Sequence, residues 1–134
     1  MEDIFVGRLM SSPVETVSPD TEVHVAAEKM IDERIGSVLV TDDEGQLAGI
    51  LTATDFVHIA AEQRWAADAT VETYMTTDVT TTTANAEIRD VADTMIEQGF
   101  HHMPVVDETE GVVGIITTTD ITAYMSHVQT PSPS

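Results

Sequence analysis

Cysteine is absent from this 134-residue chain, so the protein has no disulfide bonds and no thiolate nucleophile. The absence leaves the compartment unsettled, because cysteine-free proteins occur in reducing and oxidising environments alike. Hydrophobic residues make up 42% of the chain. That share is enough for a compact fold with its own core.

Basic residues are almost as scarce as cysteine. Lysine and arginine together number 5 against 24 aspartates and glutamates, the net charge is −19, and Lys29 is the only lysine. A surface of this sign repels nucleic acid and anionic membranes, so neither is an expected partner. The carboxylates are scattered, which we interpret as a halophile-type surface, with an ordinary acidic bacterial protein as the alternative. At about 1 M salt the Debye length is roughly 3 Å, which would screen an anionic ligand from this charge.

Long apolar runs are also missing. No stretch approaches the roughly eighteen apolar residues of a membrane-spanning helix. The first five residues, MEDIF, lack the basic and apolar regions of a signal peptide. We therefore expect a cytoplasmic protein.

The motifs of common enzyme classes are missing as well. The sequence has no GxxxxGK[ST] loop, no GxGxxG after a first strand and no Ser-His-Asp arrangement that we can place. His101 and His102 are adjacent, and adjacent side chains on an extended chain face opposite ways, so a shared metal ion is poor chemistry. His24, His58 and His127 are not part of any recognisable group of site residues. We expect no catalytic activity, no cofactor and no metal site.

The informative stretch is residues 98–120. It contains a strand at 103–106, a charged turn at 107–111, a second strand at 112–116 and the polar step Thr117-Thr118-Thr119-Asp120 at a helix start. A helix N-terminus supplies free N–H groups and positive potential. Hydroxyls can bind phosphate oxygens, and a carboxylate can accept from a ribose diol. The pattern indicates a polyol and phosphate site, with a plain helix cap as the alternative.

The same stretch occurs twice. A shift of 65 residues places GIITTTD at 114–120 on GILTATD at 49–55, and no gap is needed between 6–56 and 71–121. A repeat in fixed register predicts two half-domains packed around a pseudo-two-fold axis.

Each repeat has the order β-α-β-β-α, which predicts an α/β (α+β) fold. The segments are assigned from hydrophobic periodicity and turn signals. In the first repeat they are a short helix at 3–10, a strand at 14–17, a helix capped by Asp20 and ended by Gly36, strands at 37–41 and 46–51, and a helix from 52 to 60. The second repeat has a helix at 71–75, a strand at 79–82, a helix capped by Asn85, the strand pair above and a helix at 119–126. The predicted boundaries are 1–62 for the first repeat, 63–70 for a connector that holds Trp65, 71–127 for the second repeat and 128–134 for a disordered tail.

With these motifs the chain resembles a tandem CBS-domain pair, also called a Bateman module, over residues 6–126. The resemblance rests on the Gly-hydrophobic-hydrophobic-Thr-x-x-Asp motif at 49–55 and 114–120 and on residues 101–107, HHMPVVD. It implies a free-standing regulatory module that binds AMP, ADP or ATP in two clefts between the repeats and signals in trans to an unknown protein partner. Two alternatives stay open: an S-adenosylmethionine or dinucleotide binder, and a ligand-independent dimerisation or protein-interaction module.

The resemblance also implies which residues form the two clefts. Asp55 and Asp120 would bind the ribose hydroxyls, and the flanking hydroxyls would lie by the phosphates: Thr52, Thr54, Thr117 and Thr119. Each cleft would be completed by the other repeat. The Asp55 cleft would be completed by Met75, Asp78, Thr80, Phe100, His101 and His102. The Asp120 cleft would be completed by Met10, Pro13, Glu15, Ile35, Gly36 and Ser37.

The two predicted clefts differ in charge. His101 and His102 would favour phosphorylated ligands in the Asp55 cleft, although they are equally compatible with ordinary surface histidines. Gly36 and Ser37 offer no base, so the Asp120 cleft is expected to bind weakly, to take a nucleoside-like ligand or to stay empty. The last helix of each repeat carries surplus apolar residues, which predict a homodimer: Phe56, Ile59, Ala60, Ile121, Tyr124 and Met125.

Overall fold

The computed structural model describes residues 3–62 and 68–128, which form two compact units. We call Val14–Val79 the Asp55 unit, and residues 1–13 together with 80–134 the Asp120 unit. The predicted α/β fold is confirmed, and the helices and strands recur in the same order in both halves of the chain except that β1 has no counterpart in the second half. Trp65 and the predicted tail beyond Val128 lie outside the described residues. No helix in the described part of the chain is long and apolar enough to cross a membrane.

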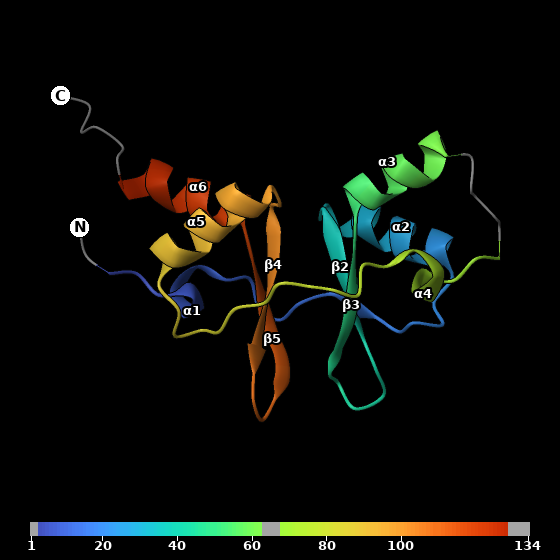
Figure 1. Cartoon of the computed structure of the whole chain (residues 1–134), viewed down its shortest axis with the longest axis horizontal. Coiled ribbons are helices and arrows are strands. Elements are labelled where there is room, and N and C mark those ends of the chain that lie inside the picture. Colours follow the sequence, from blue (N-terminus) through green and yellow to red (C-terminus); the bar gives the residue numbers. More distant parts are fainter. Residues whose placement is uncertain (1–2, 63–67, 129–134) are drawn as a thin grey trace. The chain divides into compact units, whose positions relative to one another are not determined.

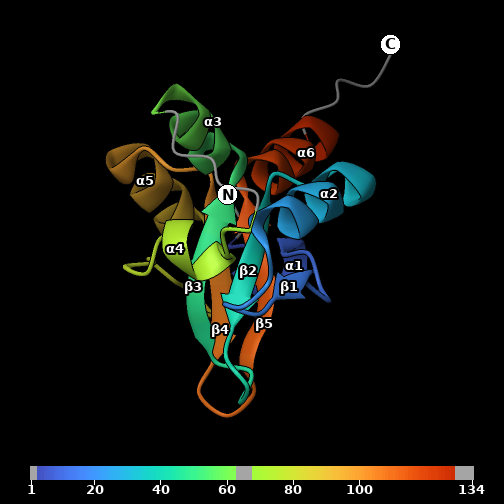
Figure 2. The ribbon, with the colours of Figure 1, turned by 90° about the vertical axis from the view of Figure 1, so that its right-hand side faces the viewer.

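The Asp55 unit is a three-stranded sheet covered by helices. The sheet has the order β1-β2-β3, with β1 (Thr16–Val17) parallel to β2 (Ser37–Thr41) and β2 antiparallel to β3 (Leu47–Thr52). The helices are α2 (Val23–Glu33), α3 (Ala53–Ala61) and α4 (Val71–Tyr74). In Figure 2, α2 and α4 lie on either side of the β2–β3 hairpin. The hydrophobic core includes the fully buried residues Val38, Val40, Leu51 and Val71.

The Asp120 unit has the same plan with one strand fewer. Strand β4 (His102–Asp107) pairs antiparallel with β5 (Gly111–Thr117). The helices are α1 (Val6–Leu9), α5 (Ile88–Gln98) and α6 (Thr118–Val128). The core gathers Val6, Met95, Met103, Val105 and Ile116 among others. This unit therefore buries apolar residues from both ends of the chain.

The predicted strand at 79–82 is wrong, and a proline explains why. In the Asp55 unit the Leu39 N–H donates to the Glu15 carbonyl at 3.3 Å, which extends the parallel pairing of β1. Pro104 occupies the equivalent position of β4 and has no N–H to donate. Only Thr82 pairs, through a single parallel bridge to Val105.

The first segment of each repeat packs in the unit that holds the end motif of the other repeat. Figure 1 shows α1 beside α5 and α6. The Val6 N–H donates to the Ala86 carbonyl at 2.9 Å, and Ser11 forms a bridge with Ile115. Helix α4 is joined to the Asp55 unit in the same way, because Thr76 forms a bridge with Ile50. The compact units thus divide the chain at other positions than the sequence repeats do.

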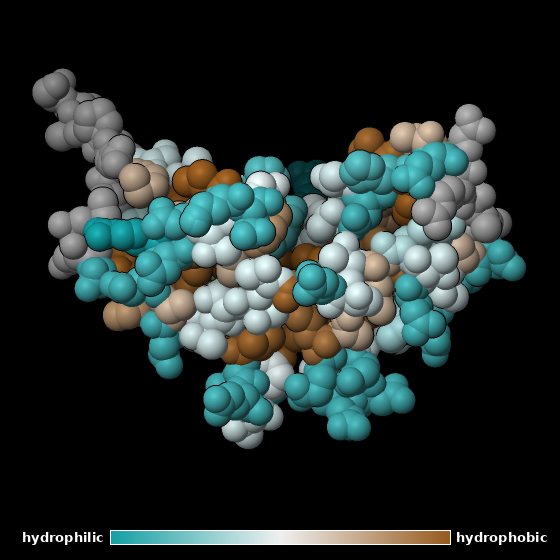
Figure 3. All heavy atoms as spheres, in the orientation of Figure 1, coloured by the Kyte–Doolittle hydropathy of each residue, from teal (hydrophilic) through white to brown (hydrophobic). Residues whose placement is uncertain are grey.

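The hairpin ends are hydrophilic turns built around aspartates. The Asp42 carboxylate accepts from the N–H groups of Glu44 and Gln46, each at 2.9 Å. Asp107 accepts from Thr109 and Glu110 in the other hairpin, and these two bonds hold the pKa of the Asp107 carboxyl below its ordinary value. Figure 3 shows hydrophilic surface over each hairpin end.

The predicted N-caps Asp20 and Asn85 are wrong. Helix α2 begins after Glu22 and α5 after Glu87, and neither residue makes a side-chain cap. Backbone carbonyls from distant segments satisfy the first N–H groups instead. The Val23 N–H donates to Ala69 at 2.9 Å, and the Ile88 N–H donates to Ile4 at 2.7 Å. Since these bonds do the work of a cap, no side chain is needed there.

The predicted helix stop at Gly36 is also wrong. Helix α2 ends at Glu33, and Arg34 adopts the left-handed conformation with φ 57°. Its repeat equivalent Gly99 takes the same role after α5 with φ 75°. Glycine adopts this conformation without a Cβ clash, whereas arginine does so at a cost.

We expect Arg34→Gly to raise the free energy of unfolding by about 0.5–1 kcal/mol, because it removes that clash. The reciprocal change Gly99→Arg should lower it by a similar amount. No neighbouring atom lies within 4 Å of a Cβ built at Gly99, so the loss reports backbone strain alone. Urea unfolding followed by circular dichroism checks both. A destabilised Arg34→Gly would contradict the left-handed assignment.

Candidate functional site: two helix starts with reciprocal caps

The end motif of the first repeat is a capping box at the start of α3. Thr52 is the N-cap, and its Oγ1 accepts from the Asp55 N–H at 3.3 Å. The Asp55 Oδ2 accepts in return from the Thr52 N–H at 2.8 Å and from the Thr52 hydroxyl at 3.1 Å. The reciprocal bonds fix the carboxylate against the end of β3.

The second end motif has the same geometry at the start of α6. The Asp120 Oδ2 accepts from the Thr117 N–H at 3.0 Å, and the Thr117 Oγ1 accepts from the Asp120 N–H at 3.1 Å. The Asp120 Oδ1 also accepts from the Ser11 hydroxyl at 3.4 Å. The segment after α1 therefore contacts this motif directly.

The capping bonds leave part of the hydrogen-bonding capacity of these carboxylates unused. A carboxylate has about four lone-pair sites, and the capping bonds of Asp55 all end on Oδ2. Both aspartates are only half-buried, and Thr54 and Thr119 on the first helical turns are exposed. Each motif can hold a polyol through its carboxylate while helix N–H groups and hydroxyls face an anion.

Glycines bring the predicted methionines onto the strands that lead to these motifs. A Cβ at Gly49 would lie 2.8 Å from the Met75 sulfur and 2.7 Å from the Thr76 carbonyl oxygen. A Cβ at Gly114 would lie 2.7 Å from the Met10 sulfur. Because neither position has room for a side chain, Met75 packs on β3 and Met10 packs on β5. The structure thus places Met75 in the unit of Asp55 and Met10 in the unit of Asp120.

His101 and His102 lie beside the Asp120 motif. The Thr118 N–H donates to the His101 carbonyl at 3.0 Å, and His102 is paired with Thr117 in the β4–β5 register. Burial, with a smaller contribution from His101, lowers the pKa of His102, and the Asp120 charge opposes that shift. Their predicted place in the Asp55 cleft stays a prediction. Within a unit, their neighbour is Asp120.

Gly36 and Ser37 take the equivalent places beside Asp55. The Ala53 N–H donates to the Gly36 carbonyl at 3.0 Å, and buried Ser37 is paired with Thr52. Ile35 packs against the core of the same unit. These three residues were predicted for the Asp120 cleft, and that assignment likewise stays a prediction.

The remaining predicted site residues differ in their surroundings. The Glu15 carboxylate lies 3.1 Å from the ammonium group of Lys29, so it is engaged in an ion pair. Phe100 packs against the core of the Asp120 unit. Pro13, Asp78 and Thr80 are exposed.

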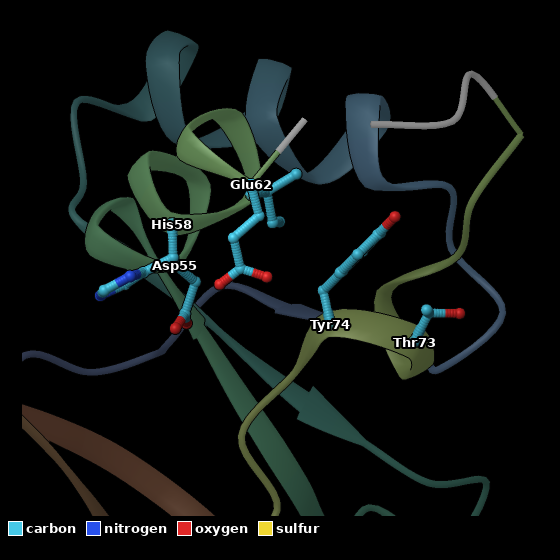
Figure 4. A pocket seen from close by; sticks show the side chains of 6 residues that line it. Asp55, His58, Glu62, Thr73 and Tyr74 are labelled. Atoms are coloured by element: carbon cyan, nitrogen blue, oxygen red, sulfur yellow. The ribbon is translucent and has the colours of Figure 1, made fainter. Parts of the chain in front are cut away.

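A hollow of about 180 Å³ lies next to Asp55, between α3 and α4. Asp55 and Glu62 line it together with residues that the motif did not indicate: His58, Ile59, Thr73 and Tyr74. Figure 4 shows the Glu62 carboxylate pointing into the space between Asp55 and Tyr74, while His58 points away from Tyr74. Among the described residues, no group of three or more acidic or histidine side chains is arranged to hold a metal ion.

Sequence reasoning missed this hollow for an identifiable reason. Asp55, His58 and Glu62 follow the spacing of one helix face, which was a usable signal. Tyr74 comes from α4, however, and nothing local in the sequence places α4 against α3.

Comparison with known proteins gives one consistent result. The model of the CBS domain family matches residues 6–62 and 71–127. A 17.7 kDa protein of Acidianus ambivalens is 31% identical over 93% of this chain, which spans 75% of that protein. The protein MJ1225 of Methanocaldococcus jannaschii is 30% identical over 93% of this chain, which spans only 46% of it. The solved CBS-domain pair of MJ0100, in complex with 5′-methylthioadenosine and S-adenosyl-L-methionine, is 28% identical with a TM-score of 0.87, covering 96% of this chain and 100% of that one.

The lowered pKa of His102 predicts a pH-dependent stability. As pH falls, His102 is protonated in the unfolded chain first, at the ordinary histidine pKa near 6.5. The neutral ring therefore contributes to the free energy of unfolding above that pH, and this contribution is lost below it. The loss cannot exceed about 1.4 kcal/mol per pH unit, because a single proton is taken up. Urea unfolding at about pH 7.5 and 5.5 measures it. His102→Gln should show a smaller drop, and an equal drop in both proteins would contradict the assignment.

Proposed function

The chain belongs to the CBS-domain family, and we propose that it is a regulatory module that binds adenosine-containing ligands and passes their occupancy to a partner protein. The observation that carries this proposal is the paired end motif, in which Asp55 and Asp120 are held in the same geometry at the starts of α3 and α6. A helix cap by itself only satisfies the first N–H groups of its helix. It does not need the flanking exposed hydroxyls to recur in register.

The chemistry of each motif fits an adenosine ligand. A ribose offers two adjacent hydroxyl donors, and a fixed half-buried carboxylate is a suitable acceptor for them. Thr54 and Thr119 stand on the first turns of the two helices, where N–H groups and the helix dipole favour negative charge. The solved pair with methylthioadenosine and S-adenosylmethionine supports the same ligand class, with AMP, ADP and ATP as the phosphorylated members to test.

We propose no catalytic role for either aspartate. Each carboxylate accepts from the N–H of its own N-cap threonine, and this bonding fixes its position as a hydrogen-bond acceptor. A regulatory module changes its partner's state only through a difference in ligand affinity between two conformations.

Titration calorimetry with AMP, ADP, ATP and S-adenosylmethionine in roughly 2 M salt tests the proposal, since screening then removes the repulsion from the acidic surface. We expect saturable binding that Asp55→Ala and Asp120→Ala each reduce by about tenfold or more, the value of one charge-assisted hydrogen bond. Asp55→Ala also removes part of the capping box of α3. Thr52→Ala, which removes the cap but keeps the carboxylate, is therefore measured beside it as a control for the loss of the cap.

Asp93→Asn serves as the control for net charge, because Asp93 is exposed on α5 and belongs to neither motif. It should bind like the unmodified protein. No heat and no thermal shift with any of the four ligands would reject the proposal in favour of a ligand-independent interaction module.

The proposal includes a homodimer, but the apolar surface differs from the predicted one. Ile59 is buried within its own unit, and Phe56 and Ile121 pack against the cores. Among the described residues, the large apolar side chains exposed on helices are Ile31 (75%), Ile96 (79%), Val57 (66%), Val25 (43%) and Met125 (37%). Ile31 and Ile96 occupy the same repeat position, so both units present the same exposed residue.

Light scattering in high salt should give twice the chain mass, and the double variant Ile31→Asp, Ile96→Asp should give a single chain mass. A buried charged residue without a partner costs several kcal/mol at an interface, which is enough to separate the protomers. The control Glu33→Gln changes an exposed residue at the end of α2 and should remain dimeric. A monomer at every concentration of the unmodified protein would reject the homodimer.

A further inference from the structure

The chain segment that follows α1 brings a hydroxyl group onto the second end motif. The Ser11 Oγ donates to the Asp120 Oδ1 at 3.4 Å. The two residues are 109 positions apart in the chain, and both belong to the Asp120 unit. The contact therefore depends on the fold of this unit, and the end motif alone does not predict it.

Ser11 contacts the carboxylate oxygen that a ligand would use. The other oxygen, Oδ2, accepts from the Thr117 N–H at 3.0 Å and is held toward the end of β5. A ribose that reaches Asp120 from solvent is left with Oδ1, which has about two lone-pair sites. Since the serine hydroxyl and the ribose hydroxyls are all donors to this oxygen, they compete for it.

The backbone holds Ser11 within reach of Asp120. The Ser11 N–H donates to the Ile115 carbonyl at 2.8 Å, and the Ser11 carbonyl accepts from the Ile115 N–H at 3.1 Å. The preceding residue, Met10, packs so closely on β5 that a Cβ at Gly114 would lie 2.7 Å from its sulfur. Ser11 is exposed, so its hydroxyl can leave Asp120 by rotation about χ1 into solvent. A ligand can thus displace the hydroxyl without moving the backbone.

The Asp55 unit repeats this backbone arrangement without the side-chain contact. Thr76 is the repeat equivalent of Ser11 and exchanges two backbone bonds with Ile50, at 2.9 and 3.0 Å. Within the part of the chain that the structure describes, the Asp55 carboxylate accepts from Thr52 and not from Thr76. Thr76 therefore provides a matched control for Ser11.

We propose that the Ser11 hydroxyl is an internal competitor that lowers the affinity of the Asp120 motif for a ribose. In the ligand-free chain it occupies Oδ1, and a bound ribose turns it away at the cost of that bond. The inference rests on the proposed function and gives a physical reason for the weak binding that the sequence predicts at this motif. The bond is longer than the usual separation of about 2.7–2.8 Å between two oxygens, so the expected change in affinity is severalfold.

Titration calorimetry in the Asp55→Ala background tests the inference, because only the Asp120 motif is then intact. The probe is 5′-methylthioadenosine, whose uncharged 5′ group keeps phosphate electrostatics out of the measurement. Ser11→Ala should tighten binding by about threefold or more, because the competing donor is gone. The same variant should unfold at a lower urea concentration, because the folded protein loses a bond. A serine with a merely structural role would lower stability and affinity together.

Two further variants serve as controls. Thr76→Ala in the Asp120→Ala background removes the equivalent hydroxyl at the other motif and should not tighten binding there. Arg8→Gln in the Asp55→Ala background removes the guanidinium that lies 5.7 Å from the centre of the Tyr124 ring. It loosens the contact between α1 and α6 without touching the carboxylate, so it should leave the affinity unchanged.

Unchanged or weaker binding in Ser11→Ala would overturn the inference, and weaker binding would identify the hydroxyl as a ligand contact. Equal tightening by Arg8→Gln or by Thr76→Ala would also overturn it, because the effect would then not belong to the Ser11 hydroxyl. Binding that becomes detectable only in Ser11→Ala would support it, whereas no binding in either protein of that pair would overturn it. All of these results leave the proposed function standing as long as the unmodified protein binds, and no binding by the unmodified protein would reject the function itself.

Discussion

The reciprocal bonds between a threonine and an aspartate at each strand-to-helix junction are the interaction on which the rest of the structure depends. Thr52 and Asp55 tie the end of β3 to the start of α3, and Thr117 and Asp120 do the same for β5 and α6. These bonds set the direction of each helix and hold a carboxylate at its positive end. In the proposed function, structural capping and ligand binding would use one geometry, so a motif that looks like a plain helix start would also be a site.

Close backbone contacts then bring a second chain segment to each junction. The bridges from Thr76 to Ile50 and from Ser11 to Ile115 run over strands that carry glycine, since a Cβ at Gly49 or Gly114 would collide with Met75 or Met10. The segment that completes each unit comes from the other repeat. In the Asp120 unit this segment reaches the motif itself, where the Ser11 hydroxyl donates to Asp120.

The sequence predicted the parts of the fold that depend on neighbouring residues. The strand at Ser37–Thr41, the hairpin turns and both end motifs follow from local patterns and agree with the structure. The caps at Asp20 and Asn85 failed because carbonyls of Ala69 and Ile4, far away in the chain, take up the helix N–H groups. The hollow beside Asp55 was missed for the same reason, as Tyr74 reaches it only through the packing of α4.

The two repeats differ in the charge of the residues beside their end motifs. In a chain with 24 acidic residues and 5 lysines and arginines, a histidine pair beside one motif changes the local field more than it would on a neutral surface. Screening in strong salt reduces interactions with distant carboxylates but leaves contacts within a few ångströms largely intact. The difference between His101-His102 and Gly36-Ser37 is therefore less affected by strong salt than the effect of the overall charge.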